Sequence, residues 1–196
     1  AGGGAPATRL EAETTSFRTW ALRLEKHAAA GGFDDELDYW GDLAQGADLV
    51  LPTDGAGPNT VASVRSVSVG LDEQETRALL QQVPEVYRTQ VNDVLLAALG
   101  SVLGGWTGRE QVLVDLEGHG REELFDGVDL SRTVGWFTTL FPVSLPVVPG
   151  RDWGARLTAV KEHLRAIPGR GLGYGALLYL TDTVSLTPAA PAISFD

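Results

Sequence analysis

The sequence predicts an α/β fold, in which helices pack on a mixed β-sheet. Three observations predict it. Apolar residues recur at helical spacing in several long segments. Short runs rich in β-branched and aromatic residues stand between those segments. The two kinds of segment alternate loosely, without the regular spacing of repeated β-α-β units, so the sheet is expected to be mixed rather than parallel.

Six segments are expected to be helical, and four of them begin after or at a residue that can cap a helix. The expected helices are 17–30, 35–43, 72–82, 89–104, 153–167 and 176–181. Their N-caps would be Ser16, Asp72 with Glu75 in a capping box, Thr89 and Asp152. The segment 89–104 is apolar over most of its circumference, so it should be buried.

Four runs have strand character, the first by alternation and the others by composition. They are 61–69, 112–116, 133–147 and 192–195. Pro142 interrupts the third run, which indicates an edge strand or a bend because proline cannot donate a ladder hydrogen bond. Residues 1–15, rich in Gly, Ala, Glu and Thr, are expected to be a loose tail or linker, and 44–60 a loop.

The composition limits the classes of function that the chain can have. The 196 residues suit one domain or two small lobes, and 43% hydrophobic with 21% charged residues is ordinary for a soluble globular protein. The absence of cysteine excludes disulfides, thiolate metal ligands and cysteine nucleophiles, and fits the reducing cytoplasm, the expected location. A net charge of −11 disfavours nucleic acid and anionic membranes as partners. No apolar run is long enough to predict a transmembrane helix.

Several motif matches are better explained by structural roles than by ligand binding, metal binding or catalysis. The glycines from Gly171 to Ala176 match a dinucleotide-binding pattern, but a helix precedes them where that pattern needs a strand, so they are interpreted as loop residues. His27, His119 and His163 stand far apart without a second ligand at metal spacing, so no metal site is expected. His27 and His163 lie near predicted helix C-termini, where a positive charge is favourable. No nucleophile-elbow serine motif occurs.

The polar stretch "DLEGHGREE" begins where the predicted strand 112–116 ends. Glu117 stands just past this strand, and Gly118 after it lets backbone or substrate approach closely. Glu117 is either a solvated surface acid or a placed acid/base group. Arg121 and Glu122 could form a structural ion pair or touch a substrate.

Five ordered motifs resemble those of epimerization domains of nonribosomal peptide synthetases, which belong to the condensation-domain superfamily. Glu117–Glu122 is similar to the EGHGRE motif that separates epimerization from condensation domains. The other motifs are Asn92–Ala97, Arg132–Pro142, Pro168–Gly175 and Ile193–Phe195, the last with Asp196 where the family has asparagine. Thr15–Phe17, Trp20, Tyr39 and Trp40 also fit this region of the family.

The resemblance implies a chloramphenicol-acetyltransferase-like lobe with a mixed sheet and packed helices. Residues 16–196 would form the C-terminal lobe of an epimerization domain with its final motif truncated, because the HHxxxDG motif of the N-terminal lobe is absent from the sequence. The implied activity is L-to-D epimerization of the α-carbon of an aminoacyl or peptidyl thioester by proton abstraction and return. Whether the chain is a truncation, a fragment or half of a split enzyme stays open.

The resemblance also assigns roles to residues. Glu117 would be one acid/base group, and the HHxxxDG histidine of the missing lobe the other. Gly118 makes room, His119 is a neighbour and Asp93 is structural. Residues that would line or support the substrate tunnel are Arg121, which would tie the loop in place, and Arg132, Trp136, Phe137 and Tyr174. Core packing is an equal interpretation for Trp136 and Phe137.

The implied partners are a peptidyl carrier protein, which supplies the phosphopantetheine arm, the missing lobe and neighbouring synthetase domains. The chain itself is expected to bind no cofactor. Two other functions stay open: a condensation-type acyltransferase that forms amide bonds, and a non-catalytic docking or scaffold lobe. The lone chain is expected to be inactive and, because the second lobe is missing, to expose an apolar face. The amino acid or peptide, the group that deprotonates the L-form and the oligomeric state are left open.

Overall fold

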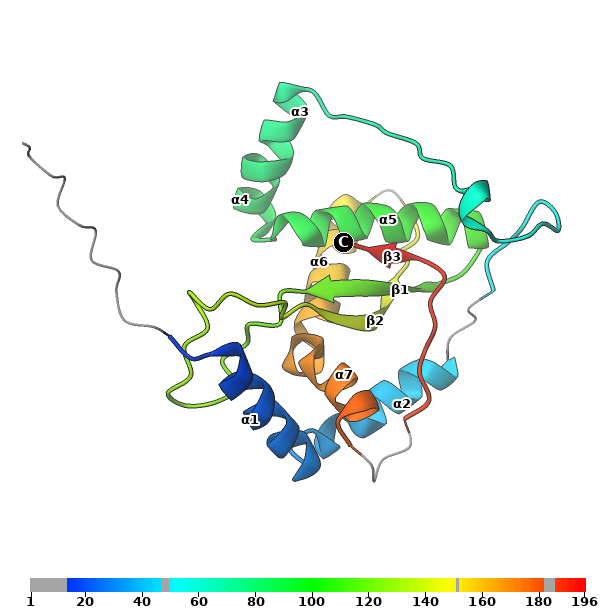
Figure 1. The fold of residues 1–196 in the computed structure, drawn as a ribbon. Helices are drawn as coiled ribbons and strands as arrows, with labels where there is room; N and C mark the ends of the chain where they lie inside the picture. Colours follow the sequence, from blue (N-terminus) through cyan, green and yellow to red (C-terminus); the bar gives the residue numbers. More distant parts are fainter. Residues whose placement is uncertain (1–13, 47–49, 151, 182–185) are drawn as a thin grey trace, which may run out of the picture.

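The computed structural model describes residues 14–46, 50–150, 152–181 and 186–196 and contains a mixed three-stranded sheet (Figure 1). The strands are β1 (Gln111–Gly118), β2 (Thr139–Pro146) and β3 (Ser194–Phe195). β1 is central, antiparallel to β2 and parallel to β3. The mixed α/β architecture is the one expected.

Helices surround this sheet. The longer ones are α1 (Phe17–Ala29), α2 (Leu37–Gly46), α5 (Val91–Thr107), α6 (Trp153–Arg165) and α7 (Leu172–Tyr179). Helix α5 contacts β1, β2 and α6, whereas α7 contacts β2 and α1. Short helical pieces are η1 (Asp34–Glu36), η2 (Val61–Ser63), α3 (Glu73–Arg77), the π-helix η3 (Ala78–Gln82), α4 (Val83–Tyr87) and η4 (Pro168–Gly171).

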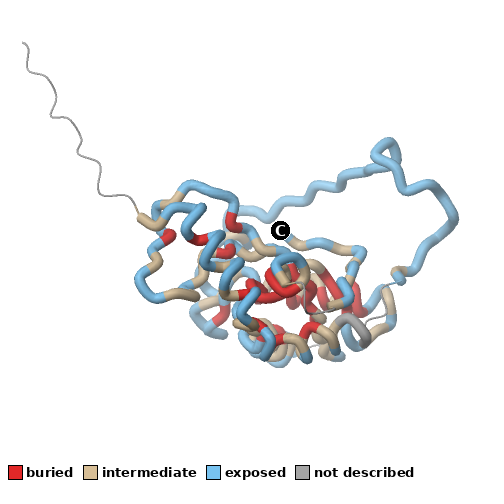
Figure 2. The backbone as a smooth tube through the Cα atoms, turned by 60° about the horizontal axis from the view of Figure 1, so that its bottom comes forward, coloured by how far each residue is buried: buried red, intermediate tan, exposed pale blue. Residues whose placement is uncertain are grey.

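The core lies between the sheet and the helices (Figure 2). Trp40 of α2 is fully buried, as are Val114 of β1 and Val143 and Leu145 of β2. Small residues allow close packing here: a Cβ on the buried Gly104 of α5 would lie 2.4 Å from the Val147 side chain. Burial of such side chains contributes about 25 cal/mol per Å² of apolar surface removed from water.

Local capping signals place most helices correctly. The Ser16 hydroxyl accepts a hydrogen bond from the Thr19 N–H at 3.1 Å, and Asp72 caps α3. The Asp152 carboxylate accepts from the Ala155 N–H at 3.2 Å. Ser16, Asp72 and Asp152 are therefore the caps that the sequence predicted.

The predicted cap of α5 is wrong. The N-cap is Gln90, whose N–H donates to the Asp93 carboxylate at 2.7 Å. The Thr89 hydroxyl is buried with no hydrogen-bond partner. The Asp93 carboxylate thus accepts from the N–H of the N-cap residue, and its negative charge in the first turn suits the positive end of the helix dipole.

The strand predicted at 61–69 is also wrong. This stretch contains η2 and then no regular structure, and its valines are exposed, with Val67 at 90% and Val69 at 94%. In Figure 2 it belongs to a long exposed excursion away from the buried core. A strand requires a neighbouring strand to accept its ladder hydrogen bonds, and the described part of the chain places none beside these residues.

Other boundaries move by a few residues. The extended structure expected from Thr133 begins only at Thr139, after a loop. Pro142 lies in β2, which is an edge strand as its proline predicted. The helix expected to end near Gln82 continues through η3 and α4 to Tyr87, with Pro84 in the first turn of α4.

Of the tail expected over 1–15, residues 1–13 lie outside the described residues. Thr15, in contrast, is held against the loop between β1 and β2. Its N–H donates to the Asp129 carbonyl at 2.9 Å, and the Thr133 hydroxyl donates to its carbonyl at 2.6 Å. The folded part of the chain therefore includes Thr15, which the sequence placed in the tail.

Candidate active site

The sequence suggested that Glu117 stands just past the strand. In the structure it lies within β1, among the last residue pairs of that strand. Its Cα pairs with that of Leu140 in β2, and Gly118 pairs with Thr139. β1 extends to Gly118 because β2 provides a paired residue for each position of β1 as far as Gly118. Glu117 is exposed, and it lines a cavity of about 610 Å³.

This cavity, here called the Glu117 cavity, is bounded by residues from β1, the start of α5, the end of α6 and η4. Its polar and charged lining residues are Gln90, Asn92, Asp93, Glu117, His119, Glu122, Arg165 and Arg170. Leu96, Leu116, Phe141, Leu164 and Ile167 form its apolar wall. The cavity therefore presents a carboxylate next to both apolar surface and cations.

Glycines are required where the chain leaves β1. A Cβ on Gly118 would lie 2.7 Å from the Thr139 hydroxyl and 3.2 Å from the Phe141 ring. Gly120 has φ of +65°, and a Cβ there would lie 1.7 Å from the Phe137 carbonyl oxygen. Any side chain at Gly120 would therefore displace the loop that follows Glu117.

Arg121 ties this loop to the next one. Its guanidinium donates to the Leu130 carbonyl at 2.5 Å and to the Thr133 carbonyl at 2.9 Å. It also lies 4.1 Å from the centroid of the Phe137 ring, within cation–π range. Arg121 thus bonds to backbone carbonyls and does not form the ion pair with Glu122 that the sequence allowed.

Glu122 instead lies within ion-pair distance of Arg170 and His119. Its carboxylate lies 3.3 Å from the Arg170 guanidinium and 3.5 Å from the His119 Nε2. The His119 Nδ1 accepts a hydrogen bond from the Arg121 N–H at 3.0 Å. His119 therefore supports the turn beside Glu117, and it lines the same cavity.

Arg170 is a site residue that sequence reasoning missed. It adopts a left-handed backbone conformation with φ of +50° in the turn between α6 and α7. Arg170 lines the Glu117 cavity, and its side chain is largely exposed. No local periodicity could show this, because the contact with Glu122 joins segments far apart in the sequence.

The glycine-rich segment has a structural explanation. The buried Glu36 carboxylate accepts a hydrogen bond from the Trp40 Nε1 at 2.8 Å. A Cβ on Gly173 would lie 2.1 Å from this carboxylate, and one on Gly169 3.0 Å. Burial raises the pKa of Glu36, although the Trp40 hydrogen bond opposes that rise. The glycines therefore fit around a buried acid, and α6 rather than a strand precedes them, which is inconsistent with dinucleotide binding. The loop predicted for 171–176 is wrong, because α7 (Leu172–Tyr179) already begins at Leu172 and includes Gly173 and Gly175, whereas a helix was expected only over 176–181.

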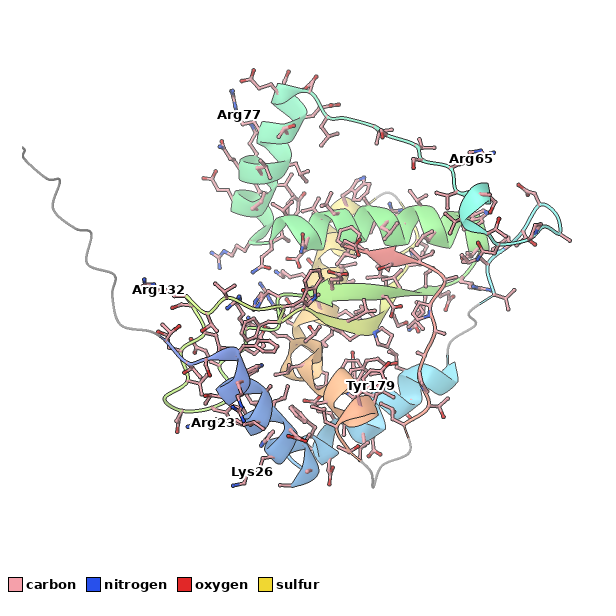
Figure 3. The ribbon with its side chains drawn as sticks, viewed as in Figure 1. Arg23, Lys26, Arg65, Arg77, Arg132 and Tyr179 are labelled. Carbon is pink, nitrogen blue, oxygen red and sulfur yellow. The ribbon has the colours of Figure 1, made fainter. Side chains whose placement is uncertain are left out.

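The remaining predicted tunnel residues are separate from the Glu117 cavity. Arg132 lies on the outer part of the loop between β1 and β2, pointing away from the sheet (Figure 3), and does not line the Glu117 cavity. Trp136, Phe137 and Tyr174 line a second cavity near α1 and α7. Trp136 is 83% exposed, whereas Phe137 and Tyr174 are buried, so core packing applies to Phe137 and not to Trp136.

The histidines near helix ends differ from each other. His27 lies in the last turn of α1 and packs edge-on against Phe33 and Phe125. Burial lowers the pKa of His163, and its Nε2 is buried with no hydrogen-bond partner. His163 does lie in the last turn of α6, as predicted, but desolvation disfavours its charged form.

Within the described residues, no group of three or more histidine, cysteine or acidic side chains could hold a metal ion. No helix in that same part of the chain is long and apolar enough to cross a membrane.

The fold, the mixed sheet and the placement of the EGHGRE turn define a lobe of the condensation-domain type. The family model described as "Condensation domain" matches residues 6–193. The chain belongs to this family.

Its relatives are peptide synthetases. The chain is 48% identical over 190 residues to one of the linear gramicidin synthase proteins of Brevibacillus parabrevis, covering 96% of this chain and 4% of that protein. It is 40% identical over 184 residues to gramicidin S synthase 1 of Brevibacillus brevis, covering 93% of this chain and 17% of that protein. The chain thus spans a small part of the curated relatives that it matches.

Among solved structures, the chain resembles the epimerization domain from the third module of tyrocidine synthetase B, with a TM-score of 0.83 and 36% identity. The match covers 95% of this chain and 44% of that one. The condensation domain of a monacolin K polyketide synthase matches with a TM-score of 0.68 and 22% identity, covering 96% of this chain and 46% of that one, a likeness of fold alone.

Proposed function

We propose that this chain is the C-terminal lobe of an epimerization domain, which interconverts the L and D forms of an aminoacyl or peptidyl thioester. The observation that carries the proposal is Glu117 of the EGHGRE motif, located at the end of the central strand and lining a cavity. The higher identity and TM-score of the match to an epimerization domain support the choice of activity within the family.

The chemistry needs two proton-transfer groups. A thioester carbonyl acidifies the neighbouring α-proton, because the electron pair left by the C–H bond delocalises onto the carbonyl oxygen as an enolate. A carboxylate such as Glu117 can accept this proton on one face, and a second group returns a proton to the opposite face. The second group would be the HHxxxDG histidine of an N-terminal lobe, either as the acid/base partner or as a donor to the enolate oxygen.

The surroundings of Glu117 suit this role. Leu116, Phe141 and Ile167 keep part of the cavity wall apolar, while Arg170 places positive charge within it. A cation beside a developing enolate would stabilise its negative charge. The close approach of Gly118 to Thr139 keeps the backbone near β2, so Glu117 projects from a fixed position.

The substrate would be carried on the phosphopantetheine arm of a peptidyl carrier protein, so the cofactor belongs to the partner. The lobe would work with an N-terminal lobe and with neighbouring synthetase domains. No redox or pyridoxal group is needed for this reaction, because the thioester itself stabilises the carbanion.

The test is solvent deuterium exchange. The chain is combined with an HHxxxDG-containing lobe, and an L-aminoacyl carrier protein is incubated in deuterium oxide. Deuterium at the α-carbon together with D-product is expected, with a loss of at least about 100-fold for Glu117→Gln, the usual scale of general acid–base catalysis. Glu123→Gln, an exposed acid in the same loop, is the matched control.

Two other outcomes would replace the proposal. Amide-bond formation with an acceptor aminoacyl carrier and no exchange indicates a condensation-type acyltransferase. A folded two-lobe assembly that binds the carrier and does neither indicates a docking lobe.

A further inference from the structure

A second cavity, here called the aromatic pocket, lies between α1, α7, the start of β2 and residues 188–189. It encloses about 490 Å³, within the range of sites that hold small molecules. Its wall is mainly aromatic and aliphatic. The aromatic lining residues are Phe17, Trp20, Trp136, Phe137, Tyr174 and Tyr179.

One charged residue lines this pocket. It is Asp115 of β1, and no lysine, arginine or histidine is among the lining residues. No ion pair or side-chain hydrogen bond is formed by the Asp115 carboxylate within the described residues. Burial raises the pKa of this carboxyl, with no opposing cation. The pocket is therefore apolar with one unpaired negative group, and a cation on an apolar body is the ligand that complements it.

The position of Asp115 is fixed by the sheet. Its Cα pairs with that of Pro142 on one side and that of Ser194 on the other, and its N–H donates to the Ile193 carbonyl at 2.8 Å. A residue paired on both sides cannot move without breaking the ladder. Asp115 is thus rigidly placed relative to Glu117.

Asp115 and Glu117 stand two residues apart on β1 and so lie on the same face of the strand. At about 3.3 Å per residue, their Cα atoms are separated by roughly 6.6 Å. Leu140, which pairs with Glu117 across β1 and β2, lines the aromatic pocket, so the pocket that contains Asp115 extends to the residue opposite Glu117.

We propose that the aromatic pocket holds the amino-acid residue of the substrate, with its free α-ammonium on Asp115 and an apolar or aromatic side chain against Trp20, Phe137 and Tyr174. This inference rests on the proposed function and narrows it. The substrate is an aminoacyl thioester with an unmodified amine. A peptidyl thioester has a neutral amide nitrogen at the same place and cannot form an ion pair with Asp115.

The test is a binding measurement on the full chain, which needs no catalysis. The probes are L-phenylalanine joined by an amide bond to aminopantetheine, and the N-acetylated form of the same compound. Affinities are measured by calorimetry. The free amine should bind at least about 10-fold more tightly than the acetylated probe, a difference of about 1.4 kcal/mol.

Asp115→Asn should remove this preference and leave the affinity for the acetylated probe unchanged. Asp42→Asn, at an exposed acid of α2, should change neither. Urea unfolding of both variants checks that they fold.

Equal affinity for the two probes would overturn the proposal, as would a preference that survives Asp115→Asn or an absence of binding to either probe. Tighter binding of the N-acetyl-L-ornithine analogue than of the phenylalanine analogue would also overturn it, since the cation would then come from the side chain. These results do not depend on proton exchange, so failure of the epimerase assay and failure of the pocket assignment are distinguishable.

Discussion

Gly120→Ala tests how the loop after Glu117 is held. Gly120 and Gly127 lie in the same loop with similar left-handed φ values of +65° and +72°. A Cβ on Gly127 meets nothing within 4 Å, whereas one on Gly120 would lie 1.7 Å from the Phe137 carbonyl oxygen. The two substitutions therefore share the conformational cost and differ in the steric clash.

The expected losses of stability follow from the conformational cost, which both variants share, and from the steric clash, which only Gly120→Ala has. Alanine in the left-handed region costs about 1–2 kcal/mol at either position. Relief of the clash at Gly120 must move the loop away from β2, which adds about 1–3 kcal/mol. Gly127→Ala should lower the free energy of unfolding by about 1–2 kcal/mol and Gly120→Ala by about 2–5 kcal/mol.

Urea unfolding followed by tryptophan fluorescence measures both variants. With a slope of about 2 kcal/mol/M, the midpoint of Gly120→Ala should fall below that of Gly127→Ala by roughly 0.5–1.5 M. Equal midpoints for the two variants would refute the close approach of Gly120 to Phe137 and with it the described shape of the Glu117 loop.

Three further predictions concern the same lobe. Arg121→Ala should lower the free energy of unfolding by about 2–4 kcal/mol in urea titrations, because two charged hydrogen bonds and a ring contact are lost; a change below about 0.5 kcal/mol would contradict those contacts. The raised pKa of Glu36 means that its contribution to stability is complete below the ordinary carboxyl pKa and is lost as pH rises through the raised value. Glu36→Gln should therefore flatten thermal stability against pH in that window, and an unchanged slope would show that Glu36 is not desolvated. The lone chain should catalyse no α-proton exchange, because one of the two proton-transfer groups is missing, and measurable exchange by the purified chain would overturn the two-group mechanism.

The helices were predictable where local signals decide. In α1 and α6 an apolar stripe, a capping side chain and a clear stop all agree, and the structure follows them within two residues. At α5 the cap was misassigned by one residue: the N-cap is Gln90, whose N–H donates to Asp93, and the Thr89 hydroxyl is buried without a hydrogen-bond partner.

The strands depended on partners that sequence alone does not reveal. Alternation at 61–69 shows only that the segment could be half-buried, and within the described residues no strand lies beside it. Glu117 belongs to β1 rather than to the following loop because Leu140 pairs with it from a segment distant in sequence.

The candidate site was predictable in part. The EGHGRE resemblance selected Glu117 and its neighbours, and Glu117, Gly118 and His119 do lie together around one cavity. Arg170 was missed because a left-handed turn brings it to Glu122. Asp115 was missed because its environment depends on α1, α7 and residues 188–189, which only folding assembles around it.

The most direct test of the central claim is deuterium incorporation at the α-carbon of an L-aminoacyl carrier protein, with this chain and an HHxxxDG lobe present together. The account predicts deuterated D-product with the natural chain and at least about 100-fold slower exchange with Glu117→Gln. Exchange at an unchanged rate in the Glu117→Gln variant would contradict it.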